Sequence, residues 1–119
     1  MSPDRFKDQC ARLSREDELR FLAALQHELT ICVRGCYSER PQIVRSDVNS
    51  PIGTLNEVQH WIAGHLIDVV DGKQDRQALG DLIHAIIIRA QAARIETPVT
   101  FGVERALQHS ITLEPALAR

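Results

Sequence analysis

One stretch decides the fold of this chain: residues 54–95, TLNEVQHWIAGHLIDVVDGKQDRQALGDLIHAIIIRAQAARI. Apolar residues recur every three or four positions on both sides of Gly72, a pattern typical of two amphipathic helices. Because the turn between them is short, the two helices should lie antiparallel as a helical hairpin. We therefore expect an all-α protein, an antiparallel bundle of four to five helices around the hairpin at residues 54–95.

Capping residues predict where the hairpin helices begin and end. Thr54 and Glu57 have the spacing of a capping box, in which both side chains accept backbone N–H groups of the first turn. The first helix should therefore begin at Thr54 and run to about residue 71, where Gly72 supplies a left-handed stop. Asp75 is a suitable N-cap for the second helix, which we expect over residues 76–95.

Similar patterns predict two helices before the hairpin. A short one near the N-terminus should place Phe6, Cys10 and Leu13 on one stripe. A longer one should run from its N-cap, Ser14, to about residue 37. Its apolar residues share one face, which should join the core: Phe21, Leu22, Leu25, Leu29, Cys32, Val33 and Cys36.

The C-terminal part should contain one more helix. Residues 96–98 end in a proline, which should break the chain, and a last helix should follow over residues 100–110. That helix should direct Phe101, Ala106 and Leu107 inward. Residues 112–119 should form a tail that is loose or docks on a partner.

A long loop is expected over residues 38–53. Pro41 and Pro51 lie in this segment, and each proline also restricts the residue before it. A short extended piece could form near residues 42–48.

The composition fits one cytoplasmic domain over residues 1–119. The net charge is −2 and the Lys and Arg residues are scattered, so we expect neither nucleic acid nor a membrane as a partner. The longest apolar run, residues 82–88, is far shorter than the roughly 20 residues that span a bilayer. Three cysteines, an odd number, occur without a visible signal peptide, which favours reduced thiols in a cytosol.

The second hairpin helix is apolar on nearly every side. One wide face should be core, and a second face also carries apolar residues: Ala85, Ile88, Ala92 and Ile95. Four or five helices from one short chain are few to cover both faces, so we expect a homodimer that pairs through the hairpin. The alternative is that this helix is the central helix of a monomer.

The first hairpin helix carries an unusual polar side. Five residues stack on adjacent turns opposite the core stripe: Glu57, His60, Trp61, Gly64 and Asp68. A glycine inside a helix costs about 1 kcal/mol relative to alanine and often marks the close approach of another group. A tryptophan beside it is a large apolar area to leave in water. We predict that another helix, a second subunit or a ligand packs on this side.

An alternative interpretation is a metal site. Glu57 and His60 have the Glu-x-x-His spacing of di-iron bundles, and Asp81 and His84 repeat an acid–histidine pair on the next helix. The two pairs would face each other in an antiparallel hairpin. A complete site needs further carboxylates, for which Glu28 is the candidate.

A second alternative is phosphotransfer, with His60 as the acceptor. The stretch His60-Trp61-Ile62-Ala63-Gly64 resembles the His-x-x-Lys-Gly motif of histidine-phosphotransfer bundles, and residues 57–66 look like the phospho-acceptor helix of some bacterial sensor kinases. The resemblance covers about ten residues. It implies that a helix-borne histidine takes a phosphoryl group and that a glycine one turn later admits the partner. Ala63 stands where the family carries its lysine.

The main prediction for function rests on the absence of other motifs. The sequence contains no nucleophile elbow, no glycine-rich phosphate loop and no Cys-x-x-Cys pair. We therefore expect a small, bacterial-type accessory or regulatory protein without a cofactor, which is not an enzyme and acts through contacts with other proteins.

Overall fold

The structure, a computed structural model, describes residues 4–39, 50–73 and 75–117 of the chain. Every regular element within these ranges is a helix, so the all-α prediction is confirmed. The helices are α1 (Lys7–Ala11), α2 (Arg15–Glu39), α3 (Pro51–Val70), α4 (Arg76–Ala92) and α5 (Glu96–Leu117). None of the helices searched in the described part of the chain is long and apolar enough to cross a membrane.

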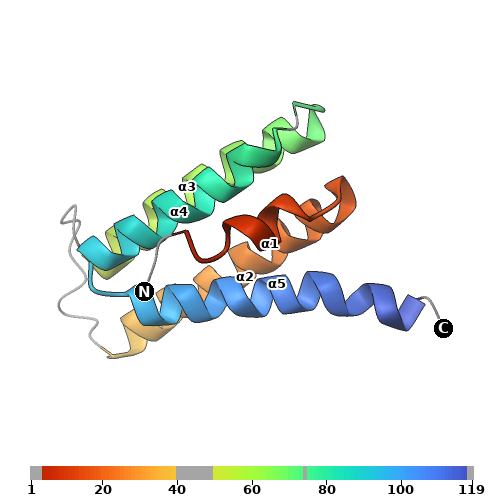
Figure 1. Cartoon of the computed structure of the whole chain (residues 1–119). Coiled ribbons are helices and arrows are strands. Elements are labelled where there is room, and N and C mark those ends of the chain that lie inside the picture. Colours follow the sequence, from red (N-terminus) through yellow and green to blue (C-terminus); the bar gives the residue numbers. More distant parts are fainter. Residues whose placement is uncertain (1–3, 40–49, 74, 118–119) are drawn as a thin grey trace.

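Two antiparallel helix pairs make up the bundle (Figure 1). α3 and α4 form the predicted hairpin, and α2 packs most extensively on α5. α2 also contacts α3, and α4 contacts α5, which joins the two pairs into one bundle. α1 packs on α4 and leads directly into α2.

The core follows the predicted apolar faces. Phe21, Leu22, Leu25 and Leu29 of α2 are completely buried, as are Ile86 and Ile87 of α4. Phe6, Cys10 and Leu13 bury the predicted N-terminal stripe against the same cluster. The second apolar face of α4 is only partly covered, since Ile88 is 46% exposed and Ala92 is exposed.

The predicted capping box at Thr54 is wrong. α3 begins one turn earlier, where the Ser50 hydroxyl accepts the N–H of Gly53 at 3.0 Å and Pro51 occupies the first position of the helix. Serine at the N-cap followed by proline is a strong start signal in its own right. Thr54 lies inside the first turn, 1% exposed, and its hydroxyl has no hydrogen-bond partner among the described residues.

The predicted N-caps of α2 and α4 and the predicted stop of α3 are confirmed. The Ser14 hydroxyl accepts the N–H of Asp17 at 3.2 Å, and the Asp75 carboxylate accepts the N–H of Gln77 at 2.9 Å. Gly72 ends α3 with a positive φ of 80°. α4 ends three residues earlier than expected, at Ala92.

A left-handed residue causes the early end of α4. Arg94 has φ 61°, its N–H donates to the carbonyl of Gln91, and the N–H of Ile95 donates to the carbonyl of Ala90. These two bonds form a Schellman motif, which closes a helix by satisfying its last carbonyls. Arginine occupies the position that glycine usually takes.

The predictions for α5 need two corrections. Pro98 does not break the chain but lies in the first turn of α5, where its missing N–H is not needed. The helix also continues past the expected end at residue 110, to Leu117. Phe101 points outward and is 56% exposed, whereas Ala106 and Leu107 are buried as predicted. The inward stripe of α5 instead passes through Val99, Val103, Ala106, Leu107 and Ser110.

Helices occupy both ends of the segment 38–53, for which a loop was predicted. α2 runs to Glu39 and α3 begins at Pro51. Residues 40–49, and with them the extended piece predicted near residues 42–48, lie outside the described residues.

Candidate functional site

The five-residue side predicted on α3 divides into two parts. Glu57 and Trp61 are held within the chain, since Arg89 Nε of α4 donates to Glu57 Oε2 at 3.1 Å and the half-buried Trp61 packs against the core. His60, Gly64 and Asp68 are exposed. Part of what the sequence predicted to pack on this side is therefore α4 of the same chain.

The exposed part of α3 includes an aliphatic residue that the sequence analysis did not select. Ile67 is 60% exposed and lies one turn beyond Gly64. His60, Gly64 and Ile67 follow an i, i+4, i+7 spacing, so a helical wheel could have found this residue. We call His60, Gly64, Ile67 and Asp68 the α3 surface.

Packing among the described residues gives no reason for a glycine at position 64. A Cβ atom built on this glycine would meet no atom within 4 Å, so the space above it is open. A glycine in the middle of a helix costs about 1 kcal/mol relative to alanine. The α3 surface therefore has room for the backbone or side chains of another molecule.

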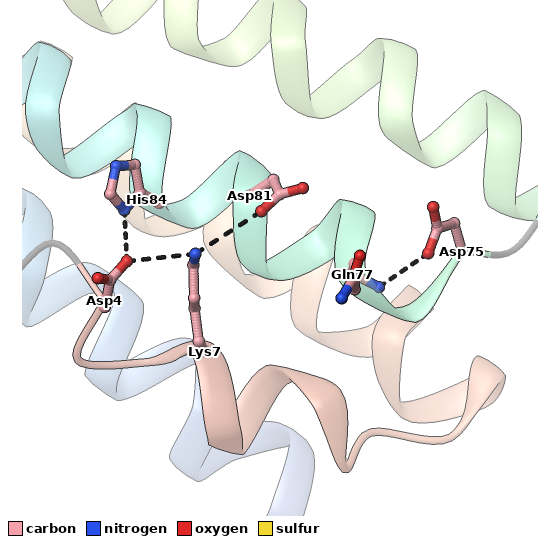
Figure 2. A network of polar contacts seen from close by, with 6 residues as sticks. All are labelled: Asp4, Lys7, Asp75, Gln77, Asp81 and His84. Carbon is pink, nitrogen blue, oxygen red and sulfur yellow. Dashed lines mark hydrogen bonds and ion pairs between the residues drawn. The ribbon is translucent and has the colours of Figure 1, made fainter.

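Three of the four candidate metal ligands contact other partners. Glu57 binds Arg89, and His84 Nδ1 lies 2.6 Å from Asp4 Oδ1. Asp81 faces Lys7 Nζ at 3.8 Å (Figure 2). The fourth, His60, is exposed. Within the residues that the structure describes, no group of three or more His, Cys, Asp or Glu side chains is placed to hold a metal ion. Ligation of a metal by Glu57, His60, Asp81 and His84 stays a prediction.

The polar network of Figure 2 fastens the N-terminal segment to α4. The Asp4 carboxylate lies between His84 and Lys7, and Lys7 also faces Asp81. The hydrogen bond with His84, followed by that with Lys7, lowers the pKa of Asp4 below its usual value. Arg5 of the same segment forms an ion pair with Glu104 of α5.

A buried acid–histidine pair connects α2 to α3. Glu18 Oε1 lies 2.8 Å from His65 Nε2, and the two side chains are only 5% and 12% exposed. Sequence patterns could not indicate this pair because 47 residues separate its members.

Burial raises the pKa of the Cys10 thiol to about 12, and the negative charge of Glu18 adds to the effect. Cys10 is thus the small apolar core residue that the sequence predicted.

An open groove lies between α2 and α5. It has a volume of about 920 Å³ and runs between residues 20–31 of α2 and residues 101–109 of α5; we call it the α2/α5 groove. Ile31 and Phe101 line it and are 48% and 56% exposed. The guanidinium of Arg105 lies 5.6 Å from the Phe101 ring centre and donates to Glu28 at 3.1 Å. The sequence analysis missed this groove because it directed Phe101 into the core.

Comparison of the chain with family models, curated proteins and solved structures finds no match. The candidate site consists of two surface features among the described residues, the α3 surface and the α2/α5 groove.

Proposed function

We propose that this protein is a non-enzymatic interaction module that associates with a second copy of itself through the α3 surface. One observation carries the proposal: Ile67 is 60% exposed beside Gly64, whose missing side chain leaves open space. Burying an isoleucine side chain fully stabilises a complex by about 2 kcal/mol, and an adjacent glycine lets the partner approach closely.

The charge of the molecule supports self-association. A net charge of −2 gives little repulsion between two copies. Symmetric pairs of identical chains are also the commonest assemblies of soluble proteins. In such a pair the chain itself supplies the partner, and no cofactor is needed.

Gly64→Leu tests the proposal because it should act in opposite directions on the monomer and on the assembly. Leucine is the better helix former and meets nothing in its own chain, so the free energy of unfolding should rise by up to about 1 kcal/mol. In the assembly it should obstruct the partner and weaken self-association about tenfold or more, as measured by sedimentation equilibrium.

Gly35→Leu is the matched control. Gly35 is also an exposed helical glycine with no atom within 4 Å of a built Cβ, but it lies near the end of α2. This variant should leave self-association unchanged. A wild-type chain that sediments as a monomer at every concentration would refute the proposal, as would a Gly64→Leu variant that associates normally.

We propose phosphoryl acceptance by His60 as a second candidate function. The supporting observation is that His60 is exposed on α3, one turn before the open Gly64. Acetyl phosphate should then produce an acid-labile adduct, detected by mass spectrometry at neutral pH. The adduct should be lost in His60→Ala and kept in His27→Ala, which removes an exposed histidine from α2. An unmodified wild-type chain would eliminate this candidate.

A further inference from the structure

We infer that the α2/α5 groove is the receiving site for the α3 surface of a second copy of this chain. The inference rests on the proposed self-association and adds the surface on the partner that α3 contacts. It also gives a role to Phe101 and Ile31, two large apolar side chains that the monomer leaves about half exposed.

The α2/α5 groove is long enough for the α3 surface. Residues 20–31 of α2 form one wall of the groove, and eleven helical steps of 1.5 Å give it a length of about 16 Å. The α3 surface, from His60 to Asp68, spans eight such steps, about 12 Å, so the groove is long enough for all of it. A volume of about 920 Å³ open to solvent fits the exposed side of a helix better than an enclosed small ligand.

The apolar residues of the two surfaces complement each other. Ile67 projects from α3, while Ile31 and Phe101 stand on opposite walls of the groove. Small residues, Ala23 and Ala24, also line the groove and leave room for an inserted side chain. Placing Ile67 between the walls would cover the exposed apolar area of both copies together.

The charges of the α3 surface and the α2/α5 groove favour contact between these two unlike surfaces. The basic residues that line the groove are Arg20, His27, Arg105 and His109, and its one acid, Glu28, is 18% exposed and pairs with Arg105. Arg20 also pairs with Asp17 and Glu16 of its own helix. The α3 surface itself carries one acid, Asp68. Beyond it lie the exposed Asp71 and Lys73, and Arg15 of α2 donates to the carbonyl of Val70. Two grooves facing each other would bring basic groups together, and two α3 surfaces would bring acids together. Contact between unlike surfaces is therefore favoured.

Two variants of the full-length chain test this contact. Ile67→Ser removes the apolar residue of the α3 surface, and Phe101→Ser removes that of the groove. Both residues are exposed, so both variants should keep the stability of the wild type. Each should weaken self-association by about tenfold or more in sedimentation equilibrium. Ile88→Ser, which removes an exposed isoleucine from α4 outside both surfaces, should not change it.

A mixture of the two variants gives the decisive measurement. A chain carrying Ile67→Ser keeps its groove, and a chain carrying Phe101→Ser keeps its α3 surface, so one intact contact forms only between unlike chains. The mixture should therefore associate more strongly than either variant alone.

The possible failures are distinguishable. If Ile67→Ser weakens association while Phe101→Ser does not, or if the mixture gains nothing, the groove assignment is overturned and the proposed function survives. If the wild-type chain is monomeric throughout, both are overturned.

Discussion

Replacing His65 with alanine is expected to destabilise the bundle by about 3 kcal/mol. His65 Nε2 lies 2.8 Å from Glu18 Oε1, and the two side chains are 12% and 5% exposed. Removing one partner of a buried pair costs roughly 3–5 kcal/mol because the other is left without compensation in a poorly solvated site. We take the lower end of this range because Glu18 has a further interaction within the chain.

Urea unfolding at neutral pH measures this loss. Trp61 is the single tryptophan and packs against the core, so its fluorescence should report the same transition as far-UV circular dichroism. In thermal unfolding the loss should lower Tm by about 12 °C, at roughly 4 °C per kcal/mol for a chain of this size. His60→Ala, the matched control at an exposed histidine of the same helix, should change stability by less than about 0.5 kcal/mol.

The double replacement Glu18→Leu with His65→Leu decides whether the two residues act as a pair. Apolar residues of similar volume often replace a buried pair with little loss, so the double variant should be much more stable than His65→Ala. The reasoning would be refuted if the double variant lost as much stability as Glu18→Leu and His65→Leu lose when their separate effects are added, because the two residues would then act independently.

Three further predictions concern other parts of the molecule. Cys10, with its pKa raised to about 12, should react with iodoacetamide at pH 8 at least a hundredfold more slowly in the folded chain than in urea, and rapid labelling seen by mass spectrometry would contradict its burial. The lowered pKa of Asp4 contributes stability to the fold at pH values above the usual carboxyl pKa of 3.8, and this contribution is lost as the pH falls through the lowered pKa. Below pH 3.8 the free energy of unfolding should therefore decline more steeply with falling pH in the wild type than in Asp4→Asn. Parallel curves for the two proteins would count against the contact between Asp4 and His84. Leu25→Ala, at a completely buried position, should destabilise the fold by about 3 kcal/mol in the same urea assay, and a loss below about 1 kcal/mol would show that the α2 core is loosely packed.

The helices were predictable wherever a single local signal operated. Apolar spacing alone indicated the buried faces of α2 and α4, and side-chain caps at Ser14 and Asp75 marked their starts. The start of α3 was not predictable in this way, because Ser50-Pro51 and Thr54-x-x-Glu57 are two overlapping start signals. Tertiary packing decides between them: Thr54 is buried, where it cannot serve as an N-cap open to solvent.

The candidate site was predictable only in part. Helical spacing predicted that Glu57, His60, Gly64 and Asp68 share one side of α3, and the last three of them are exposed. It could not show which of them α4 would hold, because the contact between Arg89 and Glu57 crosses 32 residues of sequence. The α2/α5 groove depends on the direction of Phe101. Hydrophobicity alone directed this residue inward, while the periodicity of Val99, Val103 and Ala106 places it outside.

The attachment of the N-terminal segment has a consequence for biosynthesis. Asp4 binds His84 across 80 residues of sequence, and Arg5 binds Glu104 of α5. This segment is synthesised before α4 and α5, so it finds its contacts only after both helices have been made. Until then Phe6, Cys10 and Leu13 have no complete core to enter. The nascent chain must keep this apolar stripe from other partners until then, and the bundle closes only after α5 has been synthesised.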